Sequence, residues 1–232
     1  MEQVFMINNL FKNIGNKKII KGLNLSLNKG KVLGILGPNG KGKTTLLNII
    51  SGMVKPTSGE VLIDGVKVSC ETKKLVSFLQ EKNTLSSWMT IKDAISFYKD
   101  FFDDFDEKKI KELLKFMNLD ENLKIKTLSK GMLEKLNLSL TLSRKAKLYI
   151  LDEPIAGVDP AARDYILDVI LTNYDPSASI LISTHLIADI ENILDQVIFI
   201  QNGQIRLSSS VDDIRAEEGK SVDALFREVF RC

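Results

Sequence analysis

The sequence reads Gly37-Pro38-Asn39-Gly40-Lys41-Gly42-Lys43-Thr44 in its first quarter, and this stretch decides the fold. It matches the G-x-x-x-x-G-K-[ST] pattern of a phosphate-binding loop. The apolar run before it, Val32–Leu36, is typical of a buried parallel strand. After it, apolar residues recur with helical spacing as far as Ile50, and Gly52 and Pro56 then end the helix. The sequence therefore predicts a strand, a loop and a helix in succession.

The chemistry of this loop is that of a nucleoside triphosphate site. Glycines let successive backbone N–H groups turn toward an anion, and the N-terminus of the helix adds its partial positive charge. We expect the whole loop, together with Thr45, to bind ATP. Lys43 can reach the β- and γ-phosphates, and the hydroxyl of Thr44 can hold Mg²⁺. The alternative is a plain glycine-rich turn with a surface lysine.

Composition and charge argue against several classes of protein. Of the 232 residues, 44% are hydrophobic and 27% are charged, as in ordinary globular domains. The formal net charge of +2 predicts no strong field, so no nucleic-acid partner is expected. The longest apolar runs are far shorter than the roughly 18–20 residues of a transmembrane helix, and no secretory signal is visible. Cys70 and Cys232 show neither disulfide nor metal-ligand spacing. We expect a cytoplasmic protein.

Strand and helix signals alternate along the chain and predict an α/β fold with a mainly parallel sheet, the core of a P-loop NTPase. Leu23, Leu25 and Leu27 alternate with polar residues, and Asp64-Gly65 suits a two-residue hairpin turn. An antiparallel β subdomain is therefore expected in the N-terminal part. Helical periodicity between Thr90 and about residue 147 predicts a helical insertion subdomain.

These signals divide one domain, residues 1–232, into three parts. A nucleotide-binding core with the β subdomain takes about 1–85 and 147–205, and a helical subdomain takes about 86–146. A C-terminal helical tail is expected over 206–232. Its apolar stripe, from Val222 to Phe230, predicts a helix that packs on its own domain, with a dimer contact as the alternative.

A second motif ends in two carboxylates. The apolar run Leu148–Leu151 is followed by Asp152 and Glu153. Because successive strand side chains point to opposite sides, Asp152 can serve the Mg²⁺ shell while Glu153 faces an attacking water. The alternative is that these two acids lie in a solvated loop or cap a helix. The phosphate loop earlier in the chain favours the metal and water roles over that alternative. We take Glu153 as the general base, a role that contributes roughly 10²- to 10⁴-fold to a rate.

The single histidine completes a recognisable order of motifs. His185 ends the apolar strand that begins at Ser179. A lone histidine, taken by itself, is more often structural than catalytic. From about Val4 to Ile205 the chain resembles the nucleotide-binding subunit of an ATP-binding cassette (ABC) transporter. The motifs that carry the resemblance, in order, are the phosphate loop, Gln80, Leu128-Ser129-Lys130-Gly131-Met132, the pair Asp152-Glu153, Ala156-Gly157-Val158-Asp159 and His185.

The resemblance implies a split site. In such proteins two subunits hold two ATP molecules between them, head to tail. Gln80 would sense the metal and the water and relay to a membrane partner, and His185 would touch the γ-phosphate. Asp159 would lie across the dimer interface, and Ser129 and Gly131 would contact the γ-phosphate held by the opposite subunit. Independently, Ser129 is placed to cap a helix whose N-terminus would point at an anion.

The chain departs from the family pattern at several positions. Lys130 and Met132 replace the third and fifth residues of the usual Leu-Ser-Gly-Gly-Gln. Met132 cannot return the hydrogen bond of a capping box, a loss of about 1 kcal/mol. Lys41 in the phosphate loop is also less usual than a small residue. The aromatic residue that stacks on adenine in the family would fall near Ile14, with Phe11 three residues earlier.

These observations leave three functional interpretations. The leading one is an ATPase that drives a separate membrane permease from the cytoplasmic face, together with a second cassette, identical or different, and most like bacterial exporters. The second is a regulatory subunit that binds ATP without turnover, and the third is a soluble ABC ATPase outside transport. Trp88 follows Gln80, where the family docks its permease. Its side chain belongs either to the core or to that docking surface.

Overall fold

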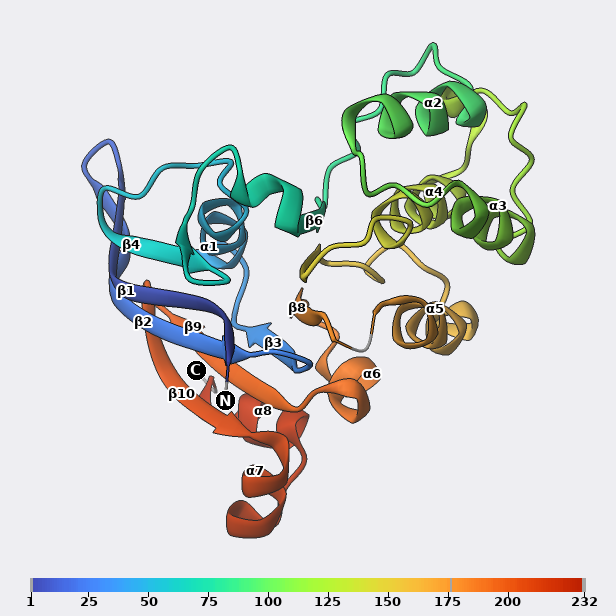
Figure 1. The fold of residues 1–232 in the computed structure, drawn as a ribbon. Helices are drawn as coiled ribbons and strands as arrows, with labels where there is room; N and C mark the ends of the chain where they lie inside the picture. The colour runs from blue at the N-terminus through green and yellow to red at the C-terminus, as the bar shows by residue number, and fades with distance from the viewer. Residues whose placement is uncertain (1, 176, 231–232) are drawn as a thin grey trace.

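The computed structural model describes residues 2–175 and 177–230. A mainly parallel sheet lies at its centre, with an antiparallel sheet on one side and helices on the other (Figure 1). Every residue of three inner strands, Val32–Leu36, Leu148–Asp152 and Ser179–Ser183, is buried, because both faces of the sheet are covered. All neighbouring pairs are parallel except β10 with β9. In spatial order the described strands are β10 (Gln204–Ser210), β9 (Gln196–Gln201), β3 (Val32–Leu36), β8 (Ser179–Ser183), β7 (Leu148–Asp152) and β6 (Val76–Leu79).

The antiparallel sheet has the expected alternation. Leu23, Leu25 and Leu27 are buried, whereas Asn24 and Ser26 between them are exposed. The Asp64-Gly65 turn has positive φ at both residues, 49° and 78°, as a type I′ hairpin requires. The described strands, in spatial order, are β2 (Lys17–Asn28), β1 (Gln3–Ile14), β4 (Ser58–Ile63) and β5 (Val66–Lys67).

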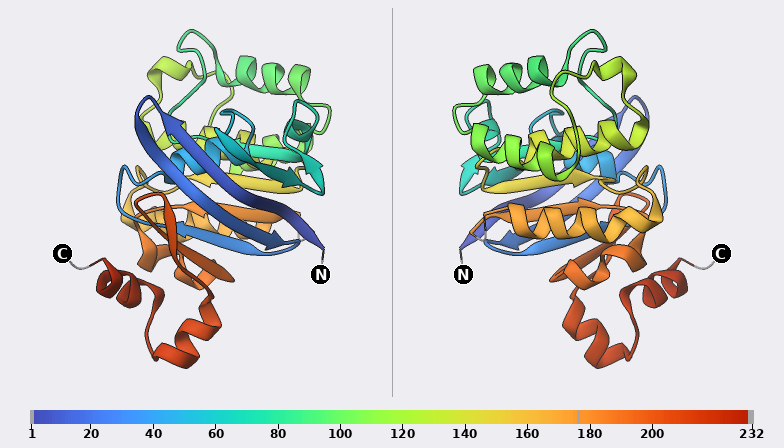
Figure 2. Two further views of the ribbon diagram at one scale, coloured as in Figure 1. Left: turned by 90° about the vertical axis from the view of Figure 1, so that its left-hand side faces the viewer. Right: turned by 90° about the vertical axis from the view of Figure 1, so that its right-hand side faces the viewer.

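The helices fall into groups at opposite ends of the molecule (Figure 2). The insertion contains α2, α3 and α4 and lies at one end, while α7 and α8 lie at the other. Side-chain caps begin α2, α3 and α4, with a full capping box at Thr90. The described helices are α1 (Lys43–Ile50), α2 (Ile91–Phe101), α3 (Glu107–Phe116), α4 (Lys130–Leu142), α5 (Pro160–Asn173), α6 (Ile187–Ile190), α7 (Val211–Glu218) and α8 (Val222–Val229), with short 3₁₀ turns η1 (Thr72–Leu75), η2 (Ile125–Thr127) and η3 (Glu191–Ile193).

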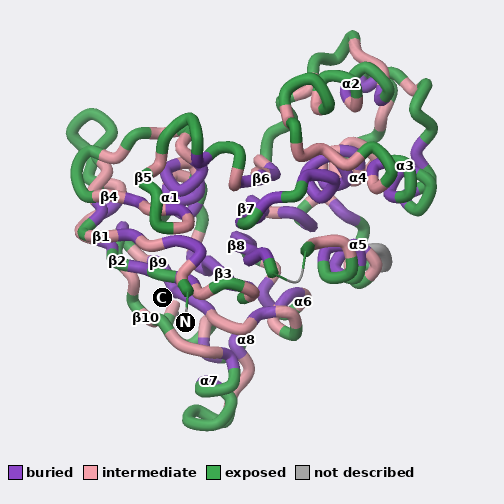
Figure 3. The backbone as a smooth tube through the Cα atoms, viewed as in Figure 1, coloured by how far each residue is buried: buried purple, intermediate pink, exposed green. Residues whose placement is uncertain are grey.

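Two hydrophobic cores lie on the two faces of the parallel sheet (Figure 3). Along β7, Leu148 and Ile150 belong to the core shared with α1 and the antiparallel sheet. Tyr149 and Leu151 belong to the core shared with the helical insertion and α5. The predicted fold class is thus confirmed: a P-loop NTPase core with an antiparallel β subdomain and a helical insertion.

Arg144 connects the insertion to the sheet. Its buried guanidinium donates to both carboxylate oxygens of Asp104, at 3.0 and 3.1 Å, and to the carbonyl oxygen of Val76 at 2.8 Å. The guanidinium carbon also lies 3.9 Å from the centre of the Phe102 ring. Since Asp104 and Phe102 belong to the loop between α2 and α3, one side chain fixes that loop to the start of β6.

Of the expectations for the tail, for Trp88 and for the cysteines, two were wrong, one is confirmed and one lies outside the described residues. Residues 206–210 are not part of a helical tail but complete β10, because the Asn202-Gly203 turn returns the chain beside β9. Trp88 is 70% exposed, so its interpretation as a core residue was wrong. The tail helix α8 does pack on its own domain, with Phe226 in edge contact with Phe199. Cys232 lies outside the described residues.

Among the described residues, no helix is long and apolar enough to cross a membrane.

Candidate functional site

The phosphate loop leaves β3 and enters α1 with the geometry of an anion cradle. Gly40 and Gly42 have φ values of 72° and 103°, which a residue with a Cβ adopts only under strain. Gly42 occupies the N-cap position of α1, and no side chain caps this helix terminus. A Cβ on Gly40 would meet no atom within 4 Å, so the space above the loop is open. The backbone N–H groups at this terminus are therefore available to an anion.

Lys43 is buried beneath the loop. Its ammonium donates to the carbonyl oxygen of Gly37 at 2.6 Å. Burial lowers the pKa of Lys43, and the negative charges of Glu153, Asp152 and Glu81 oppose that shift. A cation in this position, near three carboxylates, can give up its hydrogen bond to the Gly37 carbonyl oxygen and bind phosphate oxygens instead.

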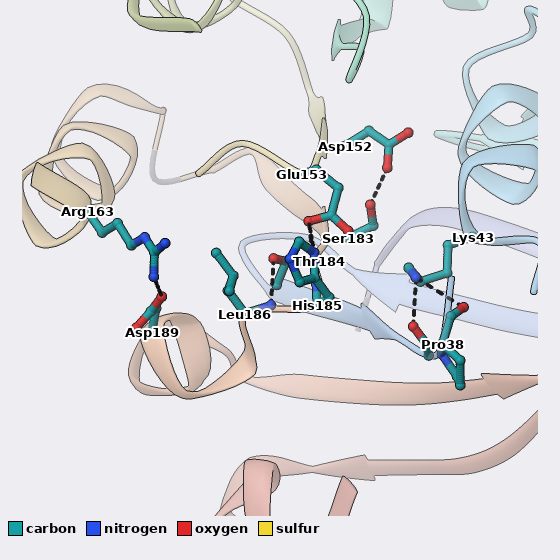
Figure 4. A network of polar contacts seen from close by, with 11 residues as sticks. Pro38, Lys43, Asp152, Glu153, Arg163, Ser183, Thr184, His185, Leu186 and Asp189 are labelled. Atoms are coloured by element: carbon teal, nitrogen blue, oxygen red, sulfur yellow. Dashed lines mark hydrogen bonds and ion pairs between the residues drawn. The ribbon is translucent and has the colours of Figure 1, made fainter. Parts of the chain in front are cut away.

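Asp152 is the last residue of β7 and is almost wholly buried (Figure 4). Ser183 donates a hydrogen bond to its Oδ1, while Oδ2 is buried and has no partner among the described residues. Burial raises the pKa of Asp152, and the hydroxyls of Ser183 and Thr44 oppose the shift. Asp152, Thr44 and Gln80 line one cavity of about 210 Å³. An unpartnered carboxylate oxygen beside a hydroxyl and an amide fits Mg²⁺, which takes few protein ligands and keeps its waters.

Glu153 and His185 point toward one another across the site (Figure 4). The Nδ1 atom of His185 lies 3.0 Å from Oε2 of Glu153. Because a carboxylate only accepts hydrogen bonds, Nδ1 must carry the proton in this contact. The backbone N–H of His185 also approaches Oε2, at 3.4 Å. The histidine therefore fixes the orientation of the carboxylate.

The separation of Asp152 from Glu153 is confirmed, but strand alternation is not its cause. Glu153 has a φ of +53°, a left-handed conformation that is costly for a residue with a side chain. Its backbone N–H still donates to the carbonyl oxygen of Ser183 at 2.9 Å. The chain thus keeps its pairing with β8 while a strained turn directs the Glu153 side chain away from Asp152.

The phosphate loop, Glu153 and His185 line a cavity of about 440 Å³. Ile19, from β2, also lines it and packs beside Gly42, with Cγ2 3.4 Å from the place a Cβ would take. The ring of Phe11 lies under Gly22 and does not line the cavity, and Ile14 is 57% exposed. The side chain that lines the cavity from β2 is thus aliphatic, and the described lining residues include no phenylalanine, tyrosine or tryptophan.

Comparisons with known proteins agree with this geometry. The sequence pattern of the ABC transporter family matches residues 20–156, more than half of the chain. This chain belongs to the ABC transporter family. It is 34% identical over 220 residues to an uncharacterized ABC transporter ATP-binding protein of Bacillus subtilis, YdbJ, covering 90% of this chain and 70% of that protein. The predicted resemblance is confirmed, and the chain is an ABC ATP-binding subunit of a transporter.

Two further comparisons extend the likeness. The lantibiotic transport ATP-binding protein SrtF of Streptococcus pyogenes is 31% identical over 212 residues, which cover 89% of this chain and 90% of that protein. A dimeric ATP-binding cassette bound to ADP and phosphate has the same fold, with a TM-score of 0.79 over 89% of this chain and 98% of its own, at 22% identity.

Sequence reasoning missed Glu81 as well as Ile19. Gln80 lines the cavity of Thr44 and Asp152 but not that of Glu153 and His185. Its neighbour Glu81, like Thr44, lines both cavities, and its charge acts on Lys43 and on Asp152. The signal available in the sequence was its position directly after Gln80, at the end of a strand beside the phosphate loop.

The other predicted residues of the cassette do not join this cavity. Ser129 begins α4, and its Oγ accepts from the backbone N–H of Met132 at 3.2 Å, as its sequence context predicted. A Cβ on Gly131 would meet no atom within 4 Å. Asp159 begins α5 and is exposed. None of these three residues lines either cavity around the phosphate loop.

Proposed function

We propose that the chain hydrolyses ATP and that this hydrolysis drives export through a separate membrane permease. One observation carries the proposal: the uncapped start of α1, Lys43 and the oriented Glu153–His185 pair surround the same cavity. These groups supply phosphate binding, charge compensation and a base in one place. A regulatory subunit without turnover would not need a strained, oriented carboxylate beside the phosphate loop.

The reaction follows from these positions. The backbone N–H groups of residues 39–45 and the Lys43 ammonium hold the β- and γ-phosphates. Glu153 takes a proton from a water molecule, whose oxygen attacks the γ-phosphorus. The bond between that phosphorus and the β–γ bridging oxygen breaks, and ADP leaves with the electron pair. His185 keeps the Glu153 carboxylate in place.

Asp152, Thr44 and Gln80 would hold Mg²⁺, with Glu81 beside them. The bound metal supplies charge neutralisation for the phosphate oxygens. The unpartnered Oδ2 of Asp152 supports this assignment, because a buried carboxylate oxygen without a partner is costly.

The head of α4 and the loop of Asp159 would complete the site of a second cassette. Ser129 and Gly131 stand at an exposed helix N-terminus, outside the chain's own cavities. A helix terminus favours an anion, and here it would meet the γ-phosphate held by the partner. The dimeric state of the structurally similar cassette supports this arrangement, with an identical or a different partner.

The permease would dock near Gln80, on the cytoplasmic face of the membrane. The strongly exposed Trp88 lies close to Gln80 in sequence and offers a large apolar contact there. Export is favoured because SrtF is a lantibiotic transport protein. The transported substrate would then be of the lantibiotic class.

The first experiment measures ATP hydrolysis against protein concentration, with Lys43→Ala as the background. Activity that rises more steeply than linearly supports sites built by identical chains. Activity equal to that of Lys43→Ala, despite demonstrable ATP binding, contradicts turnover by this chain alone and requires a different cassette or the permease.

A further inference from the structure

A carboxylate outside the phosphate-loop site joins two segments that face the proposed partner. Glu134 lies one turn into α4, and its side chain is three-quarters buried. Its carboxylate lies against Gly157: a Cβ built on Gly157 would overlap Oε1 and stand 2.6 Å from Cδ. Gly157 does not have a positive φ. A glycine is therefore needed at 157 for the space that Glu134 occupies, not for its backbone conformation.

The polar contacts of Glu134 are incomplete. Its Oε2 atom is buried and has no hydrogen-bond partner among the described residues. Its Oε1 atom lies 3.9 Å from the Lys130 ammonium, too far for a hydrogen bond. Burial raises the pKa of Glu134, and the charge of Lys130 opposes the shift. An apolar residue of similar size would avoid this desolvation, so packing alone does not account for a carboxylate here.

The two segments that Glu134 connects carry Ser129, Gly131 and Asp159, none of which lines the ATP cavity. Lys130 and Ser129 form the head of α4, and Gly157 lies two residues before Asp159. Glu134 links these segments within one chain, because its carboxylate touches the loop and attracts the exposed ammonium of Lys130.

We propose that Glu134 is a positioning residue, which holds the loop of Asp159 against the head of α4 so that both segments meet the partner's ATP together. This inference rests on the proposed function, since it concerns the half-site offered to a second cassette. Lys130, which departs from the family pattern, is the counter-ion of Glu134. Glu134 does not line either cavity around its own phosphate loop.

The test is a double-mutant cycle on the full chain, with Glu134→Ala, Gly157→Ala and the double variant. Either single change disturbs the contact, and kcat should fall about ten-fold or more, because small displacements of positioning groups have large kinetic effects. ATP binding by the chain's own loop should stay within about two-fold of wild type. In the double variant the shortened side chain at position 134 leaves room for the methyl group added at position 157, so kcat should be no lower than in Glu134→Ala.

Two controls separate positioning from stability. Glu134→Gln keeps the shape of the side chain, and kcat should stay within about three-fold of wild type. Glu112→Ala removes an exposed carboxylate from α3 and should change nothing. Thermal unfolding of each variant shows whether it folds. If Glu134→Ala does not fold, the cycle is run with Glu134→Asp, which withdraws the carboxylate by one methylene.

The outcomes are distinct. The inference would be overturned if the two single changes lowered kcat independently, so that the double variant lost kcat by the product of the two factors. Wild-type kcat in Glu134→Ala would also overturn it. Either result would leave the proposed function intact. If wild-type hydrolysis equals that of Lys43→Ala, the proposed function fails and this inference fails with it.

Discussion

The phosphate-loop region and the head of α4 differ in how complete a binding site each forms within a single chain. Around the loop, β3, β7, β8 and α1 bring Lys43, Glu153 and His185 to one cavity, and Asp152 to a second cavity that shares Thr44 and Glu81 with the first. At the head of α4, Ser129 is exposed and Gly131 is half-buried, and the Lys130 side chain between them is 78% exposed.

The difference separates binding from turnover. The loop region has what it needs to hold a nucleotide, because its backbone N–H groups and its cation come from one chain. The α4 region contributes nothing to that cavity. A change in the first region should therefore alter reactions within one chain, whereas a change in the second should appear only on assembly.

The largest effect is expected from Glu153→Gln. Removing the base should lower kcat by roughly 10²- to 10⁴-fold. ATP binding should survive, because the loop and Lys43 are unchanged. Single-turnover hydrolysis and binding of a fluorescent ATP analogue measure the two quantities separately. Wild-type kcat in this variant would remove Glu153 from the role of base.

Asp152→Asn should change the metal requirement. The variant keeps a group that can hydrogen-bond to Ser183 but loses the buried negative charge. The Mg²⁺ concentration needed for half-maximal ATP binding should therefore rise about ten-fold or more. Titration of Mg²⁺ against bound nucleotide analogue checks this without relying on activity. Glu81→Gln is the matched control and should have a smaller effect. An unchanged Mg²⁺ requirement in Asp152→Asn contradicts the metal assignment.

The β2 side of the cavity should affect affinity alone. Ile19→Ala removes apolar contact beside the loop and should weaken ATP binding about five-fold, as expected for a loss near 1 kcal/mol. The exposed Ile14 is the control, and Ile14→Ala should leave affinity nearly unchanged. Because Ile19 offers no hydrogen bond to a base edge, GTP binding should weaken by the same factor. Equal losses of ATP affinity in Ile19→Ala and Ile14→Ala would place the adenine ring against Ile14 as well.

The smallest effect is expected from Met132→Gln. Glutamine at this position can return a hydrogen bond to the backbone N–H of Ser129 and complete a capping box, which should stabilise the chain by about 0.5–1 kcal/mol. Chemical denaturation of the chain without nucleotide measures this change. Ser129→Ala is the opposing variant and should lower stability by about 1 kcal/mol. No change in either would mean that the observed Ser129 cap contributes little.

The loop region was largely predictable from the sequence because its signals are local. Residues 37–44 match a fixed spacing, and the apolar runs that become β3 and β7 end next to the chemical groups. Parallel strands then bring their carboxyl ends to one edge of the sheet. The placement of Asp152 and Glu153 followed from that reasoning, although the left-handed turn at Glu153 did not.

The parts that were missed depend on contacts between distant residues. Trp88 is apolar, and no local pattern distinguishes an exposed indole from a buried one. Arg144 meets Asp104 across 40 residues, and Glu134 meets Gly157 across 23, so neither contact has a sequence signal. Residues 206–210 of β10 were mistaken for tail because the serines at 208–210 carry little strand signal without β9 beside them.

The most direct test of a split site mixes two inactive variants. Lys43→Ala disables the phosphate loop, and Gly131→Asp places a negative charge at the head of α4, where the open space allows the chain to fold. In a mixed dimer, the loop of the second variant meets the intact α4 head of the first. The account predicts that mixing restores up to about a quarter of wild-type ATP hydrolysis, since half of the dimers are mixed and each has one complete site. Activity no greater than the sum of the separate variants would contradict it.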